Sequence, residues 1–193
     1  KSYTFMSCSK QEVTKQSFRL KIWRHLESNG LAMFPRPVYN RIPNFKGAAE
    51  AAAKLAELDV FKNATTVKVN PDKPQEPVLH VYTDFPARFI LDIFLVQTLA
   101  ACVLFDHLCP DSLECSAKYI FSGIEDTVSL DLVVMGSVAV SKEGYRIGKG
   151  RGYGDLEFGL MMHMKAIKPN TVVITTVHDC QVSHNITVLT GSL

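Results

Sequence analysis

The stretch Ser129-Leu-Asp-Leu-Val-Val-Met-Gly-Ser-Val-Ala-Val140 is followed closely by Gly144-Tyr-Arg-Ile-Gly-Lys-Gly-Arg-Gly-Tyr-Gly-Asp155, and this succession decides the fold. The first part is a near-continuous apolar run, typical of a central strand that is buried on both faces of a parallel sheet. The second part is rich in glycine and leads into residues 156–166, which we expect to be helical. A buried strand, a glycine loop and a helix in succession indicate an α/β protein.

Two further helices are expected before this core. Apolar residues at helical spacing predict a helix within residues 9–30, with Ser9 or Thr14 as its cap and Gly30 as its stop. Residues 48–58 are rich in alanine and predict a second helix by propensity.

A loop is expected between these two helices, because three prolines exclude regular helix from residues 34–47.

Strands are expected after the second helix. The alternation of strands and helices implies a three-layer α/β domain with a mostly parallel sheet, and the length favours a single domain over residues 1–193. The strands that we expect, besides that in residues 129–140, lie in residues 65–69, 78–82 and 171–177.

The longest apolar stretch of the chain covers residues 89–105. Its charge-free part, residues 93–105, is shorter than the roughly 18 residues that a membrane span needs. We therefore expect a buried helix here and no membrane association, with a membrane anchor as the alternative.

Composition restricts the class of protein. The formal net charge of +2 is too small to predict binding to nucleic acid, and the basic residues are scattered. The five cysteines are odd in number and form no C-x-x-C pair, which suits a reducing compartment. The N-terminal segment is polar and shows no signal peptide, so we expect a cytoplasmic protein.

The glycine loop is the best candidate for a binding site. Gly148, Gly150 and Gly152 recur at every second residue, so the backbone can adopt positive φ and come close to a bound group. Lys149 and Arg151 place positive charge between them, and a helix that begins near Asp155 favours an anion such as phosphate. A purely structural turn is the alternative, since the loop matches neither the standard phosphate loop nor the dinucleotide fingerprint.

A second polar stretch, His178-Asp179-Cys180-Gln181, follows the last expected strand. In open α/β sheets ligands bind beyond the carboxyl ends of the strands, so this stretch and the glycine loop are expected at the same edge. A cysteine nucleophile at Cys180 is disfavoured, because adjacent residues in such a turn point apart and no set of partners is evident.

Several stretches resemble the 5-formyltetrahydrofolate cyclo-ligase family. The strand and glycine loop within residues 131–155 are similar to the family's strand and Gly-x-Gly-x-Gly-Tyr-x-Asp loop, and Lys15-x-x-x-Arg19 is similar to its helical Lys-x-x-x-Arg. Four further stretches resemble animal members of the family. They are Phe34-Pro-Arg-Pro37, Arg41-Ile-Pro-Asn-Phe-Lys-Gly-Ala48, residues 67–75 and residues 178–182.

This resemblance implies a domain that binds ATP with magnesium and acts on a reduced folate. In the family's reaction ATP phosphorylates the formyl oxygen of 5-formyltetrahydrofolate, and ring closure then expels phosphate. The resemblance also implies that Asp155 lies near the metal, although an aspartate at this place is as readily a charge in the first turn of a helix. No catalytic residue is assigned, and the residues implied to bind the nucleotide are Lys15, Arg19, Gly148, Lys149, Gly150, Arg151, Gly152 and Tyr153.

The chain departs from the family at several points. The family's arginine after the aspartate is replaced by Leu156, no folate-contacting glutamate is found around residues 42–48, and the apolar run replaces a proline- and arginine-rich segment. After Gln181 the family's longer acidic connection and further strand are missing. Residues 79–124 and the C-terminal end are therefore expected to be atypical or incomplete, as in an unusual splice form or a misjoined reading frame.

These departures favour a noncatalytic relative that keeps nucleotide binding and serves in an RNA-associated role. The animal relatives carry a C-terminal RNA-recognition module, so RNA is expected as an indirect partner or through a module that is missing here. The alternative is an active ATP-dependent cyclo-ligase that forms 5,10-methenyltetrahydrofolate.

Overall fold

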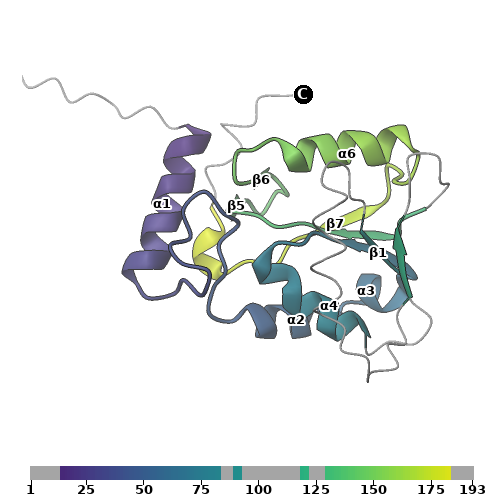
Figure 1. The fold of residues 1–193 in the computed structure, drawn as a ribbon, viewed down its shortest axis with the longest axis horizontal. Helices are drawn as coiled ribbons and strands as arrows, with labels where there is room; N and C mark the ends of the chain where they lie inside the picture. Colours follow the sequence, from purple (N-terminus) through teal and green to yellow (C-terminus); the bar gives the residue numbers. More distant parts are fainter. Residues whose placement is uncertain (1–13, 84–88, 93–117, 122–128, 184–193) are drawn as a thin grey trace, which may run out of the picture.

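A central parallel sheet organises the chain in the computed structural model, which describes residues 14–83, 89–92, 118–121 and 129–183. The five strands are β3 (Lys118–Phe121), β2 (Phe89–Asp92), β1 (Thr66–Val69), β4 (Leu132–Val134) and β7 (Val172–Ile174), in this spatial order (Figure 1). All neighbouring strands run parallel, and Lys68 of β1 lies between Leu91 and Val133 in the register. The predicted α/β fold with a mostly parallel sheet is confirmed.

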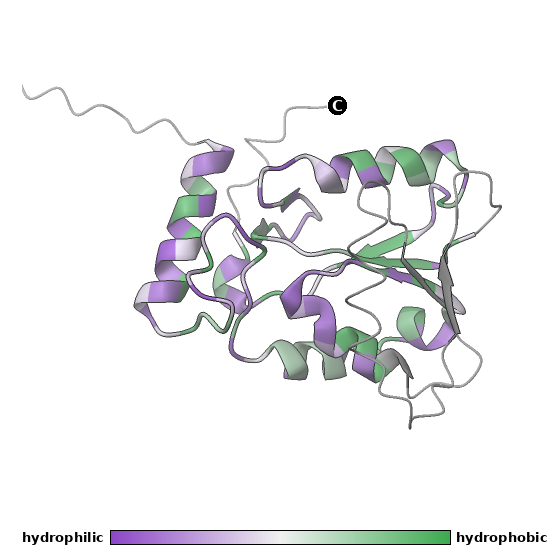
Figure 2. Cartoon of the chain, viewed as in Figure 1, coloured by the Kyte–Doolittle hydropathy of each residue, from purple (hydrophilic) through white to green (hydrophobic). Residues whose placement is uncertain are grey.

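Helices cover both faces of this sheet and complete three layers (Figure 1). One face carries α2 (Ala48–Glu57), the short α3 (Asp59–Asn63) and α4 (Glu76–Thr83), and the other carries α6 (Tyr153–His163). The strands separate the two cores by alternation, because Val67 and Val134 pack with the first group whereas Val133 packs against Met161 of α6. In Figure 2 hydrophobic residues colour parts of the sheet and of the helices that cover it, with hydrophilic residues between them.

Helix α1 (Lys15–Ser28) lies at the end of the sheet where β1 and β4 end (Figure 1). It contacts the hairpin of β5 (Ala139–Val140) and β6 (Arg146–Ile147) and the short helix η2 (Asp179–Gln181). Its cap is Thr14, whose hydroxyl accepts a hydrogen bond from the backbone N–H of Ser17 at 3.0 Å. The expected cap at Thr14 and stop at Gly30, with φ of +62°, are confirmed, and Ser9 lies outside the described residues.

The strand predicted over residues 78–82 is wrong, because this segment belongs to α4. A turn of 3₁₀-helix, η1 (Lys73–Gln75), leads directly into α4, and Pro77 is tolerated in the first turn of a helix. Val78 is fully buried, and Val81 packs against the same core three residues later. Packing against the sheet therefore outweighs the β propensity of the valines.

Two other predicted boundaries also change. Residues 129–140 are not one strand: β4 ends at Val134, and β5 begins at Ala139 in a separate antiparallel pair with β6. The helix predicted over residues 156–166 begins earlier, at Tyr153, and ends at His163. The loop at residues 34–47 and the expected elements at residues 48–58, 65–69 and 171–177 are confirmed, the last of these as the shorter β7.

The apolar run is a strand where it can be described. Phe89–Asp92 forms β2, so the expected helix does not begin at Phe89, and residues 93–105 lie outside the described residues. Among the described helices, none combines the length and the apolar character needed to cross a membrane.

The proline-containing loop is tied to α1 by Glu27. Its carboxylate accepts hydrogen bonds from Arg36 Nη2 at 2.6 Å and from the backbone N–H of Val38 at 2.8 Å. These bonds, with that of Arg36 first, lower the pKa of Glu27 although burial acts in the opposite direction.

We expect this contact to stabilise the fold at neutral pH and to be lost in acid. Because the folded-state pKa of Glu27 is lowered, its contribution, which solvent screening limits to less than about 1 kcal/mol, is present above the unfolded-state pKa and disappears as the pH falls through the folded-state value. Urea unfolding over a pH series should therefore show a smaller acid loss for Glu27→Gln than for wild type. An identical pH profile would contradict this prediction, and Glu50→Gln, at an exposed position, is the control.

Candidate functional site

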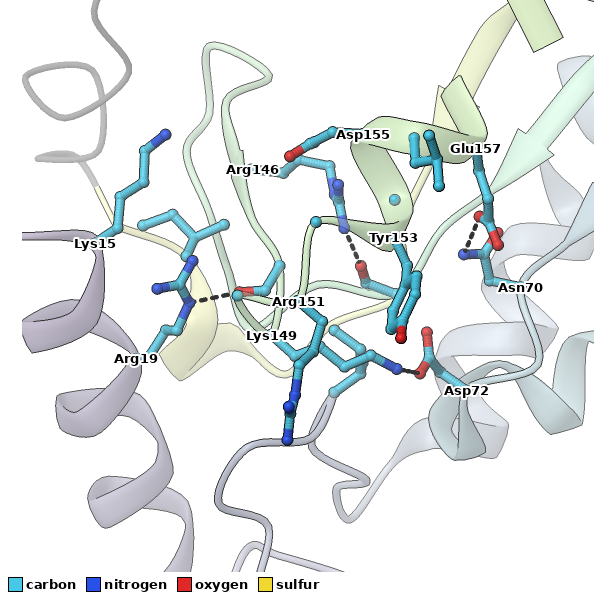
Figure 3. A pocket seen from close by; sticks show the side chains of 18 of the residues that line it. Lys15, Arg19, Asn70, Asp72, Arg146, Lys149, Arg151, Tyr153, Asp155 and Glu157 are labelled. Atoms are coloured by element: carbon cyan, nitrogen blue, oxygen red, sulfur yellow. Dashed lines mark hydrogen bonds and ion pairs between the residues drawn. The ribbon is translucent and has the colours of Figure 1, made fainter. Parts of the chain in front are cut away.

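A cavity of about 410 Å³ lies beyond the ends of β1 and β4, where the strand order reverses. The chain leaves β1 towards β2 on one side and leaves β4 towards β7 on the other, so a crevice opens beyond the carboxyl ends of these two strands. The walls are residues 70–72 after β1, Gly136 after β4 and residues 146–157 (Figure 3). The glycine loop thus lies at the expected edge of the sheet.

All nine residues predicted for the site line this cavity. Lys15 and Arg19 are four residues apart on α1 and hence on one face of that helix. The loop and the start of α6 contribute Gly148, Lys149, Gly150, Arg151, Gly152, Tyr153 and Asp155. The fold therefore brings together two segments that are more than a hundred residues apart in the sequence.

The glycines of the loop make room for guanidinium groups. Arg19 Nε donates to the carbonyl of Gly148 at 2.7 Å, and a Cβ at Gly150 would lie 3.1 Å from Arg19 Cζ. Gly150 also has φ of +91° and Gly152 has φ of +77°, in the region that side chains disfavour. The recurring glycine is thus needed to close the loop on α1.

Arg146 is a site residue that the sequence analysis missed. It lies on β6, two residues before Gly148, and its Nη2 donates to the carbonyl of Gly136 at 2.7 Å. Burial lowers the pKa of its guanidinium, while the charges of Asp155 and Asp72 act in the opposite direction. Its only signal in the sequence was a basic residue next to the glycine repeat.

A buried polar cluster of Lys68, Asn70 and Glu157 was also missed. Lys68 is 1% exposed on the central strand, and its Nζ donates to Asn70 Oδ1 at 2.6 Å and to Glu157 Oε2 at 3.2 Å. Asn70 Nδ2 donates to the same Glu157 oxygen at 3.2 Å (Figure 3). Asn70 and Glu157 line the cavity, so this cluster forms its polar end next to α6.

The cavity has a surplus of positive charge. Three carboxylates, Asp72, Asp155 and Glu157, stand against five cations, an excess of two. The cations are Lys15, Arg19, Arg146, Lys149 and Arg151. Lys149 Nζ pairs with Asp72 Oδ1 at 3.0 Å, whereas in the described part of the chain Lys15 and Arg151 form no ion pair. The arrangement suits a ligand with several negative charges.

Asp155 lies in the first turn of α6, whose N-cap is Gly152. A carboxylate there is favoured by the helix dipole without any metal. The described residues contain no group of three or more His, Cys, Asp or Glu side chains suited to a metal ion. A protein-only metal site is therefore not formed by this part of the chain.

Comparisons with known proteins agree with this architecture. The model of the 5-formyltetrahydrofolate cyclo-ligase family matches residues 11–188. The chain belongs to this family. It is 43% identical over 187 residues to the mouse methenyltetrahydrofolate synthase domain-containing protein, covering 90% of this chain and 49% of the relative.

The proteins of that name from zebrafish and human give the same result. The zebrafish protein is 45% identical over 182 residues, covering 89% of this chain and 47% of the relative. The human protein is 43% identical over 183 residues, covering 88% of this chain and 47% of the relative. The chain thus spans about half the length of these relatives.

A likeness to a solved structure is slight by comparison. An O-methyltransferase family protein from Burkholderia thailandensis aligns with 90% of this chain and 45% of its own, at 14% identity and a TM-score of 0.30. This level of similarity does not indicate a shared fold.

Cys180 of this family member is not suited to be a nucleophile. Burial, and then the charge of Asp179, raises the pKa of its thiol, which disfavours the reactive thiolate. His178 Nδ1 accepts a hydrogen bond from the backbone N–H of Cys180 at 3.2 Å and so caps η2. The segment is best explained as a structural cap.

A pair of glycine substitutions tests the loop geometry. Gly150→Ala should lower the free energy of unfolding by about 1–2 kcal/mol, because it combines an unfavourable φ with a contact to Arg19. Gly159→Ala is the control: at this exposed position in α6 an added Cβ would have nothing within 4 Å, so the change should raise stability by up to about 1 kcal/mol. Equal effects in urea denaturation would contradict the described loop.

The buried cluster should respond differently to the loss of each charge. Glu157→Gln leaves the fully buried Lys68 without a counter-ion and should cost about 2–4 kcal/mol. Lys68→Met leaves Glu157, whose side chain is 22% exposed and reached by water, and should cost less than about 1.5 kcal/mol. Thermal and urea denaturation measure both variants, and the reverse order would show that Lys68 is not the dominant buried charge.

Proposed function

We propose that this chain binds the phosphate groups of a nucleoside triphosphate, ATP in the first instance, at the glycine loop. The observation that supports the proposal is the convergence of five cationic side chains on one cavity at the point where the strand order reverses. Positive φ at Gly150 and Gly152 gives the backbone the shape of an anion cradle. The start of α6 adds the positive end of a helix dipole.

Magnesium would come with the nucleotide under this proposal. Mg²⁺ is usually held by one or two carboxylates together with substrate phosphates, and Asp155 at the rim of the cavity suits that role. The ion would supply charge neutralisation between the phosphate oxygens. The protein's own part is positioning by Arg19, Lys149 and the loop backbone.

We further propose that the chain is a noncatalytic member of the cyclo-ligase family. Leu156 is 52% exposed and lines the cavity where the family carries an arginine, so a charge that would face the reacting phosphate is lost. The alternative, ATP-dependent cyclisation of 5-formyltetrahydrofolate, is supported by family membership and by the retained loop. A reduced folate is accordingly the second ligand to test.

The cavity gives no support of its own to the RNA-associated role. Its cations surround one concave site. Nucleic-acid binding usually shows a different footprint, in which basic residues follow an extended surface. That role stays a prediction from kinship.

Isothermal titration with magnesium-ATP, alone and with 5-formyltetrahydrofolate, tests the proposal. Wild type should bind magnesium-ATP, and Lys149→Ala combined with Arg151→Ala should weaken the binding by at least about tenfold, since two phosphate partners are lost. Methenyltetrahydrofolate formation, followed by absorbance, should be absent in both proteins.

The control removes the same charge elsewhere. Lys142→Ala with Arg24→Ala changes two exposed cations that do not line the cavity and should leave the affinity within about twofold. A folded wild type that binds no magnesium-ATP would refute nucleotide binding, and measurable product would refute the noncatalytic assignment in favour of the cyclo-ligase.

A further inference from the structure

Lys149 differs from the other cations that line the cavity because it already forms an ion pair with a carboxylate of the protein. Its Nζ lies 3.0 Å from Oδ1 of Asp72, which follows β1 on the opposite wall (Figure 3). Arg19 and Arg146 donate instead to the neutral carbonyls of Gly148 and Gly136. Lys149 is thus the lining cation for which a ligand phosphate must compete with an anion of the protein.

We propose that Asp72 is an internal counter-anion of the glycine loop and makes the site select magnesium-complexed polyphosphates over metal-free ones. This inference rests on the proposed function, because it concerns the affinity and selectivity of the same site.

The segment that carries Asp72 is held in place independently of Lys149. A Cβ on Gly136 would lie only 2.8 Å from Asp72 Oδ2, so this oxygen is in close contact with the turn after β4. The backbone carbonyl of Asp72 accepts a hydrogen bond from the N–H of Gln75 at 2.9 Å at the start of η1. The segment that carries the carboxylate is thus held at the cavity wall, and we expect the carboxylate to stay there when the flexible Lys149 side chain turns to a ligand.

A fixed carboxylate has two effects on a bound polyphosphate. It keeps Lys149 neutralised in the empty site, and it repels the phosphate oxygens once Lys149 has left it. The pair is only partly shielded, with side chains 35% and 18% exposed, so both effects are moderate. The repulsion grows with the charge of the ligand, and a bound Mg²⁺ reduces that charge.

The test compares inorganic triphosphate and ATP, each with excess magnesium and with EDTA, by isothermal titration. Asp72→Asn keeps the shape of the side chain and should tighten binding of the metal-free ligands by about tenfold but that of the magnesium complexes by no more than about threefold. Glu76→Gln is the matched control, since Glu76 pairs with Lys73 on the same segment and does not line the cavity. It should leave every affinity within about twofold.

A second background shows whether Asp72 acts through the lysine. With Lys149→Ala, the added Asp72→Asn change should tighten metal-free triphosphate by clearly less than in the wild-type background, about threefold or below. Equal tightening in both backgrounds would overturn the counter-anion role. Thermal denaturation confirms that each variant is folded, and Asp72→Ser replaces Asp72→Asn if the latter is not.

The outcomes separate this inference from the proposed function. Wild type that binds magnesium-ATP, together with an Asp72→Asn protein that behaves like Glu76→Gln, would overturn the inference alone. Weaker binding of the magnesium complexes by Asp72→Asn would show that Asp72 is a metal ligand and would also overturn it. Folded proteins that bind neither ligand in any variant would overturn the proposed function and this inference with it.

Discussion

The turn at Gly136 has no room for a side chain, and the cavity depends on this constraint. A Cβ there would lie 2.8 Å from both Asp72 Oδ2 and Ile42 Cγ2. The segment after β1, the proline-containing loop and the end of β4 thus meet within van der Waals distance of one backbone position. The carbonyl of Gly136 is free to accept the hydrogen bond from Arg146, which fixes the direction in which the chain leaves the sheet.

From this turn the chain passes into the β5–β6 hairpin and then into the glycine loop. The hairpin supplies Ala139 and Ile147 to the core beneath α1, so the helix that carries Lys15 and Arg19 is held by apolar packing. Phe18, Trp23 and Leu26 provide the matching face of α1. Hydrophobic burial therefore positions the cations, and they need no partner of opposite charge to be brought together.

Only some of the charges of the site are neutralised by ion pairs. Arg19 and Arg146 are satisfied by backbone carbonyls, which accept hydrogen bonds without cancelling the positive charge. Glu157 is used by Lys68 and Asn70, and Asp72 is used by Lys149. A protein that only closed a structural turn would have no need for five cations in one concavity, which is why we favour an anion as the ligand.

Much of this was predictable from local sequence. The apolar run at residues 129–140 indicated a central strand, the alternation of elements indicated parallel α/β topology, and the glycine repeat with its basic residues indicated the loop that lines the cavity. Residues 78–82 were misassigned as a strand because valines favour strands in isolation, whereas their burial against β1 and α2 requires a helix. The break at Gly136 was hidden by the hydrophobicity of its neighbours.

The sequence by itself determined the fold class, the strands β1, β4 and β7 and the residue types of the loop, since these follow from periodicity, apolar content and the conformational freedom of glycine. Only the tertiary structure decided that Arg146 turns inward, that Lys68 is buried against Glu157, and that Asp72 faces Lys149. The physical reason is that both ion pairs join segments after or on β1 to the glycine loop and α6, which only the strand order brings together. The two paired residues lie 77 positions apart in one ion pair and 89 in the other, and no local sequence pattern predicts a contact over such a separation.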